Sequence, residues 1–163
     1  MSRPSVSRDY EWGGPLDFLR CVWNLNHELE RASLRMLREL GITAQQRLIV
    51  RAIGKFPGLP PGQLASLLHL DPSTISAALV RLEAKGILER RRDARDRRRI
   101  ALGLTARGRE LDRPTARTIE STVKRLLDTV DARDVDSTIR MLEAFTILLE
   151  SEFVDSESHS EGA

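Results

Sequence analysis

Residues 60–105 read PPGQLASLLHLDPSTISAALVRLEAKGILERRRDARDRRRIALGLT, and this stretch decides the fold of the chain. A pair of prolines opens a short helix, because a proline in the first turn lacks only an N–H that has no helical partner there. Asp71 and Pro72 open a second helix, with the Asp71 side-chain oxygen as the expected cap of its free amides. Gly86 ends that helix. The pattern predicts a helix-turn-helix.

The second of these helices has two different faces. Ile75, Leu79 and Leu82 recur at helical spacing and form the expected inner face. The outward face consists mostly of small, hydroxyl-bearing or basic residues: Ser73, Thr74, Ser76, Ala77, Val80, Arg81 and Ala84. Hydroxyl groups can bond base edges, and small side chains let a helix enter a major groove deeply. The predicted base-reading residues are Ser73, Thr74, Ser76 and Ala77. Arg81 is predicted to contact a phosphate or a guanine.

A hairpin is predicted directly after this helix. Residues 87–90 and 100–104 have apolar side chains at every second position, which is typical of short strands. Between Arg90 and Arg99, seven arginines are accompanied by only two aspartates. A charge run is most often a solvated surface, but so many guanidinium groups repel one another unless an anion lies among them. Because the run follows a helix-turn-helix pattern, we expect the hairpin to contact nucleic acid.

The segment resembles the winged helix-turn-helix of the MarR family of bacterial transcription regulators. The resemblance is carried by LASLLHLDPSTISAALVRLEAKGIL, by DARDRRR and by LTARG, and it extends more weakly over residues 16–153. The DxR element of the family corresponds to Asp96 and Arg98. The resemblance implies that Arg98 enters the minor groove at the wing tip and that Asp96 holds the wing through an ion pair. Arg95 and Arg97 would enter or border the same groove.

The composition suits one helix-rich domain. The chain has 163 residues, of which 40% are hydrophobic, 31% charged and 4% aromatic, and the scarcity of aromatics disfavours a β-sandwich. The net charge of +2 hides an asymmetry, since residues 81–109 carry eleven basic and four acidic side chains, a local charge of +7. Such a confined positive surface should dock on a polyanion in one orientation. We expect a mainly α fold with a small two-stranded β wing, as in a six-helix, MarR-like homodimer.

Other classes of site are not indicated. No apolar run approaches the roughly 20 residues that cross a bilayer, and the first residues lack the apolar block of a signal peptide, so we expect a cytoplasmic protein without a membrane partner. The single cysteine, Cys21, fits a reducing compartment. The three histidines are isolated, and no phosphate-binding glycine loop or nucleophile motif occurs. We therefore expect no metal, no cofactor and no enzyme activity.

The rest of the chain divides into an arm, two helical ends and a tail. The predicted regions are a flexible arm at 1–15, a DNA-binding region at 43–105, dimerisation helices at 16–42 and 106–153, and a disordered tail at 154–163. Within the second dimerisation part we expect one long helix from Thr105 to about residue 130, followed by a last helix. Pro114 should kink the long helix, because its ring crowds the preceding turn.

The apolar faces of the two helical ends exceed what the DNA-binding region can cover. Two copies associating through these helices would bury them and would place two reading helices one duplex turn, about 34 Å, apart. The resemblance also implies a homodimer. We therefore expect sequence-specific binding of a palindromic operator in double-stranded DNA, with repression as the usual mode of the family.

The resemblance further implies release from DNA by a small, often aromatic, anionic effector held between the dimerisation helices and the DNA-binding region. The residues suited to line such a crevice are Trp23, His27, Arg31, Arg47 and Arg51. An aromatic ring, an imidazole and a guanidinium in one row suit a ring that bears a carboxylate. The alternative is structural, with Trp23 in the core, His27 half-buried and the arginines in surface ion pairs.

Three alternatives to an effector-released regulator stay open. Cys21 is a candidate oxidation sensor, although the only tyrosine is Tyr10 and the residues after the cysteine offer no activating partner. An architectural protein would bind any DNA duplex without sequence preference, but it would not need a hydroxyl-bearing helix face. An enzyme is the least supported class, because no nucleophile and base are paired in the sequence.

Overall fold

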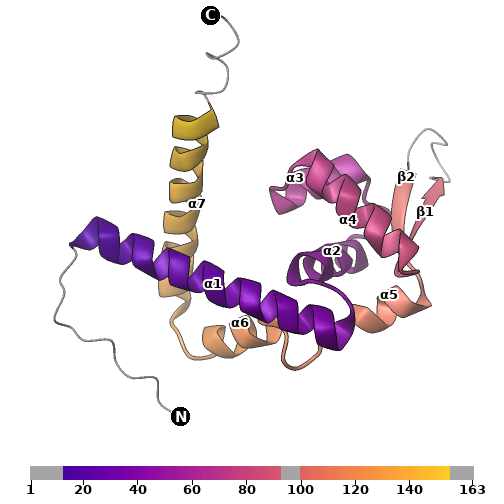
Figure 1. Cartoon of the computed structure of the whole chain (residues 1–163), viewed down its shortest axis with the longest axis horizontal. Helices are drawn as coiled ribbons and strands as arrows, with labels where there is room; N and C mark the ends of the chain where they lie inside the picture. The colour runs from indigo at the N-terminus through magenta and orange to yellow at the C-terminus, as the bar shows by residue number, and fades with distance from the viewer. Residues whose placement is uncertain (1–12, 93–99, 155–163) are drawn as a thin grey trace, which may run out of the picture. The chain divides into compact units, whose positions relative to one another are not determined.

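The structure is a computed structural model and describes residues 13–92 and 100–154 (Figure 1). The elements in chain order are α1 (Gly14–Leu40), α2 (Ala44–Lys55), α3 (Pro61–Leu68), α4 (Pro72–Ala84), β1 (Leu88–Arg92), β2 (Ile100–Leu104), α5 (Ala106–Leu111), α6 (Ile119–Leu127) and α7 (Ala132–Val154). The chain forms two compact units, Met1–Ile119 and Glu120–Ala163. The expected fold class, mainly α with a two-stranded wing, is confirmed.

The first unit has one apolar core. Figure 1 shows α2, α3 and α4 gathered together, with the two strands beside α4. The core residues are Ile42, Ile49, Val50, Ala52, Ile53, Leu64, Ala65, Ile75, Ala78, Leu79, Leu82, Ile87, Leu88, Leu102 and Leu104. Burying one such large side chain contributes about 1.5–3 kcal/mol. Because the cluster includes residues of all three helices and both strands, helix-turn-helix and wing are packed as one body.

Local capping sets the ends of several helices as the sequence predicts. The Thr43 hydroxyl accepts a hydrogen bond from the Gln46 N–H, and the Gln46 side chain accepts one from the Thr43 N–H, each at 3.2 Å. Gly41 ends α1 in the left-handed conformation, with φ of 75°. The Thr105 hydroxyl accepts from the Gly108 N–H at 3.1 Å and thereby caps α5.

The hairpin is antiparallel, with Leu88 opposite Leu104 and Arg92 opposite Ile100. A loop residue pair extends it on the other side of β2. The Gly58 N–H donates to the Leu102 carbonyl at 3.1 Å, and the Leu102 N–H donates to the Leu59 carbonyl at 3.3 Å. The connection between α2 and α3 therefore covers the edge of the wing root, which the sequence pattern did not indicate.

The predicted long helix that begins at Thr105 and kinks at Pro114 is wrong. Instead α5 ends at Leu111, α6 begins at Ile119, and an irregular segment separates them. Arg117 in this segment has a φ of 63°, a left-handed conformation that a right-handed helix excludes. The described residues therefore form seven helices, where the sequence predicted six. Arg47 and Arg51 of α2 donate to the carbonyls of residues 111–113, which a continuous helix would use for its own hydrogen bonds.

The helices at the two ends of the chain expose much apolar surface. On α1 only Met36 is buried, and the exposed residues are Leu16, Trp23, Leu25, Leu29, Leu34 and Leu37. On α7 the exposed residues are Ile139, Met141, Leu142, Ile147, Leu148, Leu149 and Phe153. Monomeric proteins rarely leave apolar patches of this extent uncovered.

Two kinds of feature are absent from residues 13–92 and 100–154. None of the helices there is both long enough and apolar enough to cross a bilayer. In the same ranges, no three side chains of His, Cys, Asp or Glu lie close enough together to hold a metal ion.

Candidate nucleic-acid interface

Helix α4 presents one face to the core and the other to solvent. Ile75, Leu79 and Leu82 are at most 1% exposed, and Ala78 adds to the same face at 4%. The exposed residues of the opposite face are Ser73, Ser76, Ala77, Val80, Arg81 and Ala84, and Thr74 is half-buried. This division matches the two predicted faces. The exposed side of α4 carries short side chains, so it can approach the floor of a groove closely.

The turn between α3 and α4 is formed by backbone conformation, without a side-chain cap on α4. His69 ends α3 with φ of 48°, a left-handed conformation that is uncommon outside glycine. Asp71 is the residue before α4, but its side chain makes no capping hydrogen bond, contrary to the sequence-based expectation.

The C-terminal end of α4 is tied to three neighbouring segments. The Lys85 ammonium group donates to the Gly41 carbonyl at the end of α1, at 2.7 Å. The Arg107 guanidinium of α5 donates to the Lys85 carbonyl at 2.9 Å, and the Thr105 hydroxyl donates to the Gly86 carbonyl at 2.7 Å. These bonds satisfy carbonyls that a helix end leaves open. They hold the end of α4 against α1, α5 and the root of the wing.

The LTARG motif has a structural explanation at this junction. The Thr105 N–H donates to the Ile87 carbonyl at 3.1 Å, so the start of α5 lies against the start of the wing. A Cβ atom on Gly108 would collide with the Ile87 carbonyl oxygen and would lie 3.1 Å from the Leu104 Cβ. Glycine is therefore needed at 108 because the Ile87 backbone occupies the place of a side chain.

Two arginines of the wing pair with glutamates of the same unit. The Arg90 Nε donates to Glu83 of α4 at 3.0 Å, and the Arg91 guanidinium lies 2.5 Å from the Glu89 carboxylate. Such partly exposed pairs contribute little to stability. Two of the seven arginines thus have a carboxylate partner within the protein, so their charges do not by themselves require an external anion.

The other predicted wing contacts fall on residues outside those that the structure describes: Arg95, Asp96, Arg97 and Arg98. Their proposed entry into the minor groove, and the ion pair expected within the DxR element, stay predictions.

The two arginines of α2 have contacts that the sequence did not indicate. Arg47 is only 1% exposed, and its guanidinium donates to the Leu111 carbonyl at 2.5 Å and to the Arg113 carbonyl at 2.9 Å. Arg51 donates to the Asp112 carbonyl and, at 2.7 Å, to the Asp112 carboxylate. The protein itself engages both guanidinium groups. These arginines therefore hold the end of α5, and their predicted contact with an effector is untested and stays a prediction.

The remaining predicted effector residues lie exposed on α1. Trp23 is 66% exposed, so it is not part of the core of this chain, and His27 is exposed as well. The Arg31 guanidinium pairs with the Glu28 carboxylate at 3.2 Å, as the structural alternative supposed. Cys21 is also exposed on this helix. Its redox role is untested and stays a prediction.

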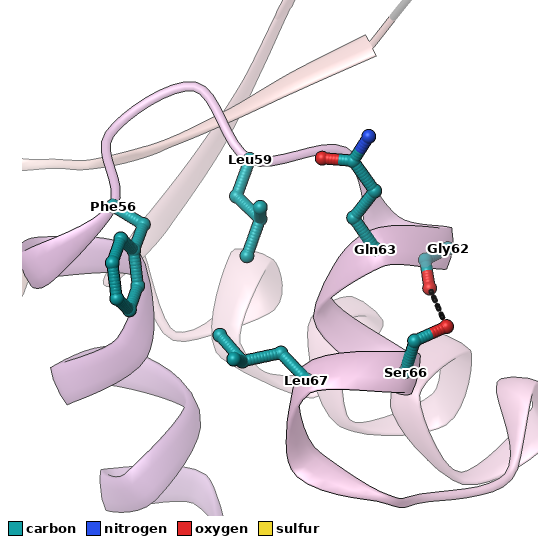
Figure 2. A pocket seen from close by; sticks show the side chains of 6 residues that line it. All are labelled: Phe56, Leu59, Gly62, Gln63, Ser66 and Leu67. Carbon is teal, nitrogen blue, oxygen red and sulfur yellow. Dashed lines mark hydrogen bonds between the residues drawn. The ribbon is translucent and has the colours of Figure 1, made fainter.

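Two shallow hollows lie beside α3. The first, of about 560 Å³, is lined by Phe56, Leu59, Gly62, Gln63, Ser66 and Leu67. Figure 2 shows the side chains of Phe56, Leu59 and Leu67 around this hollow, with the Ser66 hydroxyl donating to the Gly62 carbonyl at 3.2 Å. The second, of about 420 Å³, shares Phe56 and Leu67 and reaches Arg51. Neither hollow is lined by the predicted effector residues of α1.

Sequence comparison relates the matched part of this chain to known regulators. The model of the MarR family matches residues 40–99, which include the helix-turn-helix and most of the wing. The chain is 34% identical over 90 residues to the HTH-type transcriptional regulator TtmR of Methylorubrum extorquens (strain PA1), which covers 55% of this chain and 46% of TtmR. The chain spans about half the length of the first curated relatives that it matches.

Solved structures extend the likeness over most of the chain. FabT of Streptococcus pneumoniae, in complex with DNA, is 26% identical with a TM-score of 0.60, and the match covers 83% of this chain and 94% of FabT. The PcaV transcriptional regulator of Streptomyces coelicolor, in complex with its natural ligand, is 25% identical with a TM-score of 0.58, covering 75% of this chain and 89% of PcaV. Residues 40–99, which hold the helix-turn-helix and most of the wing, are therefore similar to the MarR family, and the fold resembles these solved regulators over most of the chain.

Proposed function

We propose that the chain is a sequence-specific regulator of transcription that binds double-stranded DNA as a homodimer. The observation that carries the proposal is the exposed face of α4, which is formed by small and hydroxyl-bearing side chains opposite a fully buried face. Support comes from the relatives, since TtmR is a transcriptional regulator and the FabT structure contains DNA. The proposal assigns no catalysis to the chain.

In the proposed complex α4 lies in the major groove and the wing reaches the adjacent minor groove. Ser73, Ser76 and Ala77 face the base edges, where a hydroxyl can donate or accept and a methyl can meet a thymine. Thr74 is half-buried and contributes less. Arg81 contacts a phosphate or a guanine at the edge of the same face. Arginines at the wing tip, Arg98 above all, extend the contact into the minor groove.

The test is a footprint on the DNA upstream of the chain's own gene, followed by fluorescence anisotropy on the protected sequence. Ala77→Glu places a carboxylate on the exposed face of α4, where it would meet base edges and phosphates, so operator affinity should fall at least about tenfold. Gln45→Glu adds the same charge at an exposed position of α2, outside α4 and outside the helices of the proposed dimer, and is the matched control, with affinity close to wild type. Equal affinities for both variants would refute the assignment of α4 to the groove.

Homodimer formation is the second part of the proposal. The exposed apolar residues of α1 and α7 support it, because association of two copies is the simplest way to cover them. A two-fold dimer would present two copies of α4 to a palindromic site whose halves lie about 34 Å apart. Sedimentation at micromolar concentration should give twice the chain mass, whereas the mass of a single chain would contradict this part.

A small anionic effector that releases the DNA is the third part, and repression is the mode of regulation that we propose with it. The exposed row of Trp23, His27 and Arg31 on α1 supports it, together with the natural ligand in the PcaV structure. Candidate aromatic acids should release wild-type protein from its operator and should release His27→Ala/Arg31→Gln only at much higher concentration. Equal release of both proteins would remove this row from the site.

Two competing functions are tested with the same operator. If exposed Cys21 senses oxidation, hydrogen peroxide should abolish binding by wild type and spare Cys21→Ser. If the chain is an architectural protein, any duplex should compete for it equally at physiological salt. The sequence-specific proposal requires that unrelated duplexes compete much more weakly than the operator.

A further inference from the structure

The segment between α5 and α6 is irregular where the sequence alone predicts a helix (Figure 1). In an α-helix each carbonyl accepts from the N–H four residues later. A continuous helix would therefore join the carbonyls of Leu111, Asp112 and Arg113 to the amides of residues 115–117. In the structure these three carbonyls accept side-chain donors from α2 instead.

The donors are two guanidinium groups that arrive from far away in the sequence. Arg47, 64 positions before Leu111, uses two nitrogens of one planar group to reach the carbonyls of Leu111 and Arg113. The Arg51 guanidinium donates to both the carbonyl and the carboxylate of Asp112. A rigid guanidinium that bridges two carbonyls fixes their separation and direction. It therefore selects a turned backbone, because successive carbonyls of a helix all point along its axis.

Three further contacts fit the turned form. Gly54 leaves room for the Asp112 side chain, since a Cβ atom at 54 would lie 2.6 Å from the Asp112 Cγ. Arg117 pairs with Glu39 of α1 at 3.2 Å. Thr118 is 3% exposed, and its hydroxyl donates to the Thr115 carbonyl at 2.9 Å.

Local preferences within the segment act in opposite directions. Pro114 opposes a helix, because its ring crowds the carbonyl four residues earlier. The left-handed backbone of Arg117 is unfavourable for a residue with a side chain, and a helix would relieve it. A helix would also gain backbone hydrogen bonds along the segment. Since these effects oppose one another, contacts from outside the segment decide its conformation.

We propose that Arg47 and Arg51 form a carbonyl clamp that keeps residues 112–118 out of the helix, and that opening the clamp lets α5 continue into α6. The clamp is then a conformational switch that determines whether residues 112–118 form an irregular segment or part of a helix. Arg51 is the accessible half of the clamp, with a side chain 39% exposed, whereas Arg47 is buried. This inference goes beyond the proposed function and does not depend on DNA binding.

Amide hydrogen exchange of the full-length chain, measured without DNA, tests the clamp. Pro114→Ala removes the intrinsic block, but with the clamp closed the amides of residues 115–117 should exchange as in wild type. Arg51→Gln combined with Pro114→Ala opens the accessible half and frees the Asp112 carbonyl, so its helical partner, the amide of residue 116, should then exchange at least about fivefold more slowly. Arg20→Gln, which breaks the exposed pair with Asp17 on α1, is the matched control and should leave the exchange unchanged.

The outcomes separate the clamp from the proline. Slowed exchange in Pro114→Ala alone would show that proline holds the break and would overturn the proposal. Unchanged exchange in the folded double variant would overturn it as well. If the double variant fails to fold, Gly54→Ala with Pro114→Ala displaces the Asp112 carboxylate while retaining both arginines, and the same slowing is expected. Wild-type exchange in that variant would count against the clamp.

Discussion

Two groups of arginines in the first unit show how differently one residue type can act. On α2, Arg47 and Arg51 donate to backbone carbonyls at the end of α5, and Arg47 is buried. On α4 and β1, Arg81 is exposed and Arg90 makes only a partly exposed pair with Glu83. The first group holds the end of α5 against α2, and the second remains accessible to a phosphate. Burial and partner, and not the number of charges, distinguish the two.

The largest expected effect is a loss of stability when the buried arginine, Arg47, is replaced. Arg47→Ala leaves the carbonyls of Leu111 and Arg113 without their guanidinium donor and opens space beneath α5, so unfolding free energy should fall by about 3 kcal/mol. Urea denaturation measures it. The matched variant is Arg81→Ala, on the exposed face of α4, which should change stability by no more than about 0.5 kcal/mol. Similar losses of stability in both variants would show that the buried and the exposed arginine do not differ in their structural role.

The second prediction concerns DNA affinity, where the order of the two variants reverses. Arg81→Ala should weaken operator binding by about 1–3 kcal/mol, because it removes a charged contact to a phosphate or a base. Fluorescence anisotropy at several salt concentrations measures both the loss and the reduced salt dependence. Unchanged affinity at moderate salt would place Arg81 outside the interface.

The features of the fold that sequence patterns predicted have local causes. The capping box at Thr43, the left-handed Gly41 and the Thr105 cap each involve residues within a few positions of one another. The buried and exposed faces of α4 follow from helical spacing alone. Each of these signals lies within one turn or one helix, so a pattern in the sequence suffices to detect it.

The features that were missed depend on contacts between distant segments. The break after α5 is stabilised by Arg47 and Arg51, which lie more than 60 positions earlier, so Pro114 alone suggested only a kink. The contacts of these arginines with backbone carbonyls could not be predicted either, because a sequence displays the charge of a side chain but not the group that accepts its hydrogen bonds. The pair of Arg90 with Glu83 joins a strand to a helix, and no periodicity predicts it. The wing-tip assignments rest on resemblance alone and stay untested.

A third prediction separates the two arginines of the clamp from each other. Arg51→Gln removes an ion pair whose side chains are 39% and 27% exposed, so solvent screens the loss and stability should fall by less than about 1 kcal/mol. The same urea titration places this variant between Arg47→Ala and wild type. A loss as large as that of Arg47→Ala would mean that burial does not govern the difference between the two positions.

The smallest effect is expected at the pair between the wing and α4. Glu83→Gln removes the carboxylate that holds Arg90, which leaves the guanidinium available to DNA and removes a negative charge from the proposed interface. Operator affinity at low salt should therefore rise about twofold, and the gain should shrink as salt screens it. Glu39→Gln, which breaks the pair with Arg117 away from the wing, removes the same charge and serves as the control. An equal rise of operator affinity in both variants would reflect net charge alone. A rise confined to Glu83→Gln would show that Arg90 contacts DNA once its glutamate partner is removed.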